Sequence, residues 1–143
     1  MNLKLNISTC PNDTFMFDAM LHGRIDTEGL TFDLNLADIE QLNQAVLEDG
    51  PDISKLSYAV VPQICDHYKV LNSGSALGRG NGPLLVSRHK IYPDELYDAQ
   101  IAIPGVHTTA NLLMSRIYPA AQNKRAYLFS DIADAVMSGE CDA

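Results

Sequence analysis

Tryptophan is absent from the 143-residue sequence, cysteine occurs three times, and basic residues are few. Cys10, Cys65 and Cys141 form no CxxC pair and no metal-like spacing with the four histidines, which argues against a disulfide framework and a structural zinc site. Ten Lys and Arg stand against 18 Asp and Glu, giving a formal net charge of −8. So acidic a chain lacks the basic face that binds nucleic acid, and an anionic membrane would repel it. We predict neither a nucleic-acid nor a membrane partner.

Long hydrophobic runs are also missing, both along the chain and at its amino terminus. No run approaches the ~18 apolar residues that span a bilayer. A signal peptide needs a continuous apolar segment of ~7–15 residues, whereas Leu3, Leu5 and Ile7 alternate with polar residues. Alternation with period two predicts a strand instead. We therefore predict a reduced, cytoplasmic protein.

Hydrophobic residues make up 46% of the chain, which is typical of a globular protein. A second alternating stretch runs from Leu30 to Leu36, and Asp38 with Gln41 forms a capping-box pattern before an amphipathic helix at 39–49. Further strands are predicted at 53–56, 70–71, 84–86, 101–103 and 127–129, and further helices at 14–22, 58–68, 108–118 and 130–137.

This alternation of strands and helices indicates an α/β fold with mainly parallel strands. By the same βαβ pattern a strand should follow Gly139, so we expect the chain to be cut in mid-fold or to borrow strands from a partner. Missing strands would leave apolar sheet edges exposed. A homodimer or a domain swap would cover such edges.

Ligands of parallel sheets bind at the carboxyl ends of strands, where loops lead into helices. This rule selects four segments: 9–14, 56–58, 74–82 and 105–110. In the last segment, free amides and the helix dipole would form a site for a carboxylate or a polyol oxygen. The alternative is that Thr108 only caps its helix.

The other segments carry residues that suit either binding or structure. Lys55 would pair with an anionic ligand or lie exposed, and Ser57 would bind a substrate oxygen or cap the next helix. Asn43 is expected to face inward from its helix, and Asp13 to cap the helix that follows it. Cys10 is expected to be a buried, inert thiol. The residues alone thus predict a protein that binds a small polar or anionic molecule.

Several of these segments, in order along the whole chain, resemble one family. It comprises the 1,4-dihydroxy-6-naphthoate synthases of the futalosine route to menaquinone, and the resemblance covers the first half of such enzymes. The segments that carry it are CPNDTF at 10–15, KLSY at 55–58, SGSALGRG at 73–80, GPL at 82–84, IPG at 103–105, HTTA at 107–110 and GE at 139–140.

The resemblance implies a two-lobed fold like that of type II periplasmic binding proteins, truncated here, with the ligand clamped between the lobes. It implies a lyase that cleaves cyclic dehypoxanthinylfutalosine to 1,4-dihydroxy-6-naphthoate without metal or organic cofactor. We place the lobes at 1–87 and 88–143, because the predicted strand at 84–86 precedes a loop. The implied substrate contacts are Lys55, Leu56, Ser57, Thr109 and Ala110, with Thr108 and Asn43 as adjacent candidates.

The resemblance also implies a histidine general base just downstream of Gly139–Glu140, beyond Ala143. A positioned base contributes ~10²–10⁴-fold to a rate. We therefore expect residues 1–143 to be nearly inactive, while their remaining groups bind and orient substrate. None of the four histidines, His22, His67, His89 and His107, matches the implied position.

Two other functions share the implied fold, because fold does not determine function. One is a non-catalytic domain that binds a small anionic solute. The other is a different enzyme of the futalosine route, such as the chorismate dehydratase, although the segments at 11–15 and 107–110 look closer to the naphthoate synthase.

Overall fold

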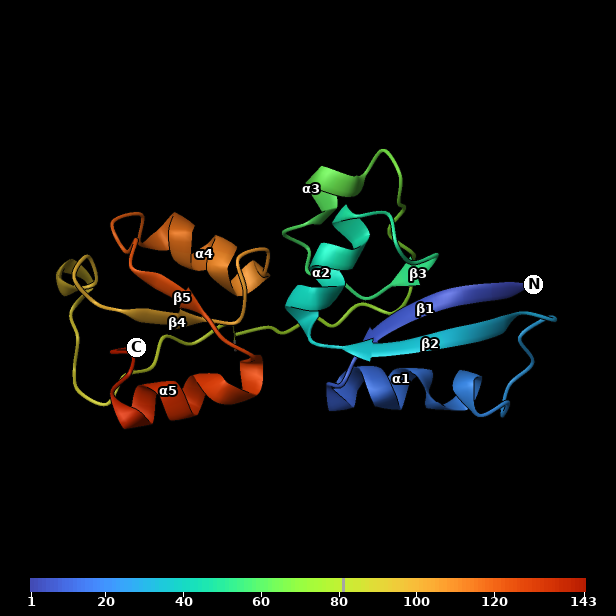
Figure 1. Ribbon diagram of the computed structural model, residues 1–143, viewed down its shortest axis with the longest axis horizontal. Helices are drawn as coiled ribbons and strands as arrows, with labels where there is room; N and C mark the ends of the chain where they lie inside the picture. Colours follow the sequence, from blue (N-terminus) through green and yellow to red (C-terminus); the bar gives the residue numbers. More distant parts are fainter. Residues whose placement is uncertain (81) are drawn as a thin grey trace. The chain divides into compact units, whose positions relative to one another are not determined.

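The computed structural model describes residues 1–80 and 82–143, which form two compact units. Unit 1 is Met1–Leu77 and unit 2 is Gly78–Ala143. Both combine parallel strands with helices, so the predicted α/β class is confirmed (Figure 1). The lobe boundary after residue 87 stays a prediction. Unit 1 contains β1 (Asn2–Ser8), α1 (Pro11–Leu21), β2 (Thr31–Ala37), α2 (Ile39–Leu47), β3 (Ile53–Ser54) and α3 (Val61–Ile64).

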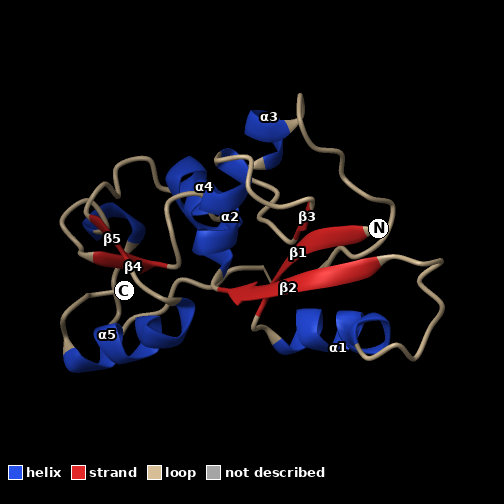
Figure 2. Ribbon diagram, turned by 45° about the vertical axis from the view of Figure 1, so that its right-hand side comes forward, coloured by secondary structure: helices blue, strands red, loops and turns tan. Residues whose placement is uncertain are grey.

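In unit 1 the central strand β1 pairs in parallel with β2 on one side and β3 on the other. The ladder with β2 runs from Asn2 opposite Thr31 to Ser8 opposite Ala37, so both predicted alternating strands are confirmed. Helix α1 covers one face of the sheet and α2 the other (Figures 1 and 2). Because the strands are parallel, the loops after them leave from one edge of the sheet.

The predicted cap of helix α2 is present. The Asp38 side chain accepts a hydrogen bond from the Glu40 amide at 3.0 Å, and the Asp38 amide donates to Gln41 Oε1 at 3.1 Å. With its first turn fixed in this way, α2 places Leu42 and Val46 in the core, where they are 0% and 2% exposed. The cap therefore positions the helix that also carries Asn43.

Tyr68 packs against the apolar cluster of α2 and α3, and its hydroxyl donates to the Pro51 carbonyl at 2.8 Å. Burial raises the pKa of Tyr68 above its ordinary value of 10.0, and the charges of Asp49 and Asp52 raise it further. The unfolded chain therefore ionises first, and stability present below about pH 10 is lost as the pH rises through the raised pKa.

We expect Tyr68→Phe to remove the loss of stability that Tyr68 ionisation causes at alkaline pH. Urea midpoints of both proteins, measured from about pH 9 to about pH 11, should fall less steeply for the variant. Equal slopes for the two proteins would show that Tyr68 ionisation is not coupled to folding.

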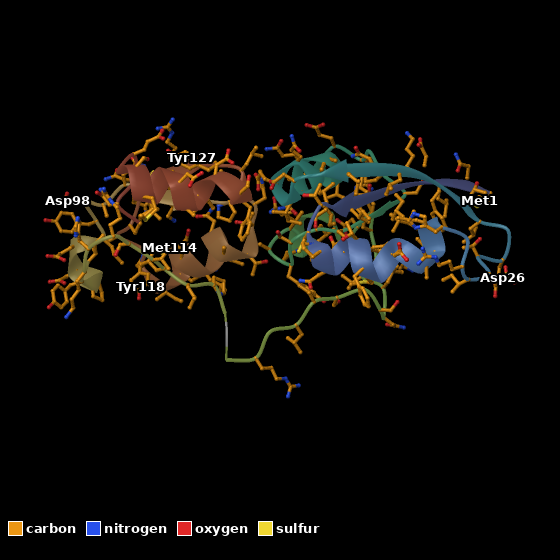
Figure 3. All side chains as sticks on the ribbon, turned by 90° about the horizontal axis from the view of Figure 1, so that it is seen from below. Met1, Asp26, Asp98, Met114, Tyr118 and Tyr127 are labelled. Atoms are coloured by element: carbon orange, nitrogen blue, oxygen red, sulfur yellow. The ribbon has the colours of Figure 1, made fainter. Side chains whose placement is uncertain are left out.

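Unit 2 contains a short parallel pair with a helix on either side (Figures 1 and 2). Ile101 and Ile103 of β4 lie in its core at 1% and 5% exposure. Met114 and Tyr118, labelled in Figure 3, pack against this core from α4 and the residue that follows it. The elements are the 3-10 turn Pro93–Glu95, β4 (Ile101–Ile103), α4 (Thr109–Ile117), β5 (Lys124–Ala126), the 3-10 turn Phe129–Asp131 and α5 (Ile132–Ser138).

Four predicted elements differ in the structure. The helix expected at 58–68 is only α3, because Pro62 has no amide to donate back to Tyr58 and the preceding turns close three residues apart. No strand is assigned at the expected 127–129, because β5 lies just before it and Tyr127 only continues the ladder by donating to the Ile103 carbonyl. Residues 70–71 and 84–86 pair with no described strand, and Leu84 is 82% exposed.

Helix α1 also begins earlier than predicted. Its N-cap residue is Cys10 and its first residue is Pro11, whose missing amide costs nothing in a first turn. The Cys10 side chain makes no capping bond and is exposed, so the prediction of a buried thiol was wrong. Asp13 therefore lies inside the first turn, with its carboxylate available for other partners.

Candidate functional site

In unit 1 a buried charge cluster lies just beyond the carboxyl end of β1. The Ser8 amide and hydroxyl both donate to Asp13 Oδ2, at 3.2 and 2.7 Å. Lys55 Nζ lies 3.3 Å from Asp13 Oδ1 and donates to the Gly74 carbonyl at 2.8 Å. The predicted capping role of Asp13 was therefore wrong, because its carboxylate binds Ser8 and Lys55 instead of its own helix.

Lys55 follows β3 and contacts two acceptors that are far apart in the sequence, Asp13 and Gly74. Its side chain is 18% exposed and that of Asp13 is 6% exposed, so the pair is largely shielded from water. An ammonium group has three N–H donors, and Asp13 and Gly74 take two of them. Among the described residues, no further acceptor is recorded for this ammonium group.

Asn43 and Ser57 form a second buried pair near the same strand end. The Ser57 amide donates to Asn43 Oδ1 at 2.8 Å, and Asn43 Nδ2 donates to Ser57 Oγ at 3.1 Å. Asn43 is 0% exposed, as its predicted inward orientation requires, and Ser57 is 9% exposed. Ser57 does not cap α3 with its side chain, since the N-cap residue of α3 is Val60.

Tyr58 adds a polar group that the sequence interpretation did not single out. Its hydroxyl lies 2.8 Å from Ser75 Oγ, which joins the segment after Ser57 to the glycine-rich loop. Lys55 reaches the same loop through Gly74. The segments predicted at 56–58 and 74–82 are thus connected by the Tyr58–Ser75 contact, and the neighbouring Lys55 adds a second contact to the loop.

In unit 2 the predicted residues surround the start of α4. The Thr108 hydroxyl donates to the Gly105 carbonyl at 2.8 Å and accepts from the Asn111 amide at 3.3 Å, so Thr108 caps the helix. Thr109 and Ala110 are the first residues of α4 and are partly buried. Their backbone amides belong to the first turn, which has no earlier helical carbonyl to bind. Such amides favour an anionic ligand.

Asn111 contributes a further polar atom that the sequence did not reveal. Its Nδ2 donates to the Val106 carbonyl at 2.8 Å, while its Oδ1 is buried and has no hydrogen-bond partner among the described residues. The predicted groups therefore form two sets, Lys55–Ser57 with Asn43 in unit 1 and Thr108–Ala110 in unit 2. That both sets face one cleft stays a prediction.

The described contacts of His22 and His67 in unit 1 do not involve the Lys55–Ser57 set. His22 lies 3.1 Å from Asp18 Oδ1, and His67 lies 4.0 Å from Asp49 Oδ2, both on exposed surface. Within residues 1–80 and 82–143, no three His, Cys, Asp or Glu side chains gather as a metal site would require. No helix in the same ranges combines the length and apolar character needed to cross a bilayer.

Comparison with known proteins finds relatives that match nearly the whole chain. The chain is 41% identical over 141 residues to a 1,4-dihydroxy-6-naphthoate synthase of Thermus thermophilus and 36% identical over 146 residues to one of Streptomyces coelicolor. These matches cover 99% of this chain but 50% and 51% of the relatives, so the chain spans about half their length.

A solved structure and a family model also match nearly the whole chain. The crystal structure of an Archaeoglobus fulgidus protein superposes with a TM-score of 0.91 at 31% identity, covering 99% of this chain and 52% of that one. The model of the menaquinone biosynthesis family matches residues 3–143. This chain therefore belongs to the menaquinone biosynthesis family.

Proposed function

We propose that this chain supplies substrate-binding residues of a 1,4-dihydroxy-6-naphthoate synthase. The observation that carries the proposal is the identity of 41% and 36%, over 99% of the chain, to two proteins of that name. The whole protein's activity is part of the proposal, because the matched segment is about half of each relative. The proposed fold of the whole protein is two-lobed, with the ligand held between the lobes.

The proposed reaction is the cleavage of cyclic dehypoxanthinylfutalosine to 1,4-dihydroxy-6-naphthoate by a lyase, without metal or organic cofactor. A general base removes a hydroxyl proton, and the electrons of that oxygen form a carbonyl as the adjacent carbon–carbon bond breaks. The electron pair of that bond passes to the other fragment, which takes up the proton held by the base. A positioned base contributes ~10²–10⁴-fold to such a step. Binding groups supply the remaining catalysis by orienting the substrate.

The described contacts support a binding role for residues 55–57. The third donor of the Lys55 ammonium and the hydroxyl of Ser57 suit a carboxylate or hydroxyl oxygen of the substrate. In unit 2, the amides of Thr109 and Ala110 suit another acidic oxygen. The product itself carries a carboxylate, which matches sites built from donors.

We propose that the general base is a histidine outside residues 1–143. In unit 1, His22 and His67 have Asp18 and Asp49 as described partners, neither of which belongs to the Lys55–Ser57 set. Residues 1–143 alone would then bind the product and give little turnover.

The proposal is tested by joining residues 1–143 to the half of the Thermus thermophilus relative that they do not match. We expect the fusion to convert cyclic dehypoxanthinylfutalosine to 1,4-dihydroxy-6-naphthoate, measured by mass spectrometry. Residues 1–143 alone should fall below the fusion by about 10²-fold or more. A folded fusion that binds the substrate without converting it would instead favour a non-catalytic binding domain.

A further inference from the structure

Asn43 is completely buried, and both of its described side-chain hydrogen bonds go to Ser57. The Ser57 amide can only donate, so the Asn43 atom facing it must be the oxygen. The NH₂ group of Asn43 then faces Ser57 Oγ, which must accept from it. The orientation of the Asn43 amide is thus determined by the backbone of Ser57.

This arrangement controls the hydroxyl of Ser57. One lone pair of Oγ is occupied by Asn43 Nδ2, and the hydroxyl proton cannot be donated to an NH₂ group that is itself donating. Among the described residues, no protein acceptor is recorded for that proton. Ser57 as a whole residue is 9% exposed, so it is less completely buried than Asn43. The hydroxyl is therefore available as a donor to a ligand.

We propose that Asn43 is a positioning residue that makes Ser57 a hydrogen-bond donor toward a carboxylate. This inference rests on the proposed function for the identity of the ligand, although the geometry involves only residues of unit 1. It assigns Asn43 a role different from the direct substrate contact expected from the sequence. Asn43 acts through Ser57, because its side chain has no exposed surface.

The critical variant is Asn43→Asp, which keeps the shape of the side chain but reverses one of its hydrogen bonds. An ionised carboxylate still accepts from the Ser57 amide, and its second oxygen accepts the Ser57 hydroxyl proton. The serine oxygen then presents lone pairs to the ligand. These lone pairs repel a carboxylate, which the hydroxyl proton would have attracted. We expect the dissociation constant of a carboxylate ligand to rise about 10- to 100-fold.

Three further variants isolate this effect. Ser57→Ala removes the donor and should weaken binding by a similar factor, while the double variant should bind no more weakly than Ser57→Ala alone. Gln44→Glu adds the same charge to the exposed face of α2 and should leave binding nearly unchanged. Additive losses in the double variant, or an equal loss in Gln44→Glu, would overturn the proposal.

The experiment titrates the ¹⁵N-labelled 143-residue chain with 1,4-dihydroxy-6-naphthoate and, separately, with benzoate as a simple carboxylate. If benzoate binds and 1,4-dihydroxy-6-naphthoate does not, the proposed function is overturned. The affinities of the variants for benzoate then decide whether the role assigned to Asn43 is correct. Failure of the wild-type chain to bind either probe would overturn both. A second measurement needs only the wild type, so it applies even if a variant does not fold. We expect a scalar coupling across the hydrogen bond from the Ser57 amide to the Asn43 side chain. Absence of this coupling would overturn the assignment.

Discussion

Alanine in place of Asp13 is expected to lower the free energy of unfolding by about 3–5 kcal/mol. The Asp13 side chain is 6% exposed and accepts three contacts, two from Ser8 and one from the Lys55 ammonium. Its removal leaves a largely buried cation and a buried amide without their acceptor, and neither can recover full hydration. Urea denaturation of the 143-residue chain measures the change.

Asp18→Ala is the matched control, because it removes the same side chain from the same helix. Asp18 pairs with Arg24 on the surface, where its side chain is 39% exposed. Surface ion pairs contribute about 0–1 kcal/mol, so this variant should be nearly as stable as the wild type. Similar losses for Asp13→Ala and Asp18→Ala would show that the buried pair has no special weight.

A combined variant separates the charge from the packing. Asp13→Leu with Lys55→Met replaces the ion pair by apolar side chains, so no charge is left buried without a partner. We expect this variant to be more stable than Asp13→Ala, because replacing a whole buried pair often costs little.

Glutamine in place of Lys55 is expected to raise the dissociation constant for 1,4-dihydroxy-6-naphthoate about 10- to 100-fold. Glutamine keeps a hydrogen-bond donor on a side chain one bond shorter, but it removes the charge that attracts a carboxylate. Because Lys55 is only 18% exposed, salt screens its interaction with a ligand less than it would on the surface. Calorimetric titration of the folded variant measures the loss.

Lys69→Met provides the control for net charge. It removes one positive charge from an exposed position of unit 1, and its effect on affinity should stay below about twofold at physiological salt. Equal losses for Lys55→Gln and Lys69→Met would mean that the ligand senses only overall charge, contrary to a specific role for Lys55.

The elements that could be predicted from the sequence are those whose signals are local. The apolar residues of β1 and β2 repeat with period two, and this pattern alone predicts both strands. The pattern does not predict burial, because Leu5 of β1 is buried whereas Leu34 and Leu36 of β2 are exposed. The Asp38–Gln41 cap and the Thr108 cap join residues only three positions apart or fewer. Such short-range chemistry is visible in the order of the residues.

The parts that could not be predicted depend on contacts distant in sequence. Asp13 has the residue type and the position of a helix cap, yet its carboxylate pairs with Lys55. The pairing of β3 with β1 brings Lys55 close to Asp13. Residues 84–86 have the apolar character of a buried strand, but no described strand pairs with them. The partner of the Asp13 carboxylate and the absence of a described pairing strand for 84–86 both depend on contacts distant in sequence. A single sequence does not reveal such contacts.

The central proposal is that residues 55–57 and 109–110 bind one small acidic molecule. It is tested most directly by adding 1,4-dihydroxy-6-naphthoate to the ¹⁵N-labelled chain and following every backbone amide by NMR. We predict saturable shift changes concentrated at Lys55, Leu56, Ser57, Thr109 and Ala110. Saturable changes confined to other residues, or to only one of the two segments, would contradict the proposal.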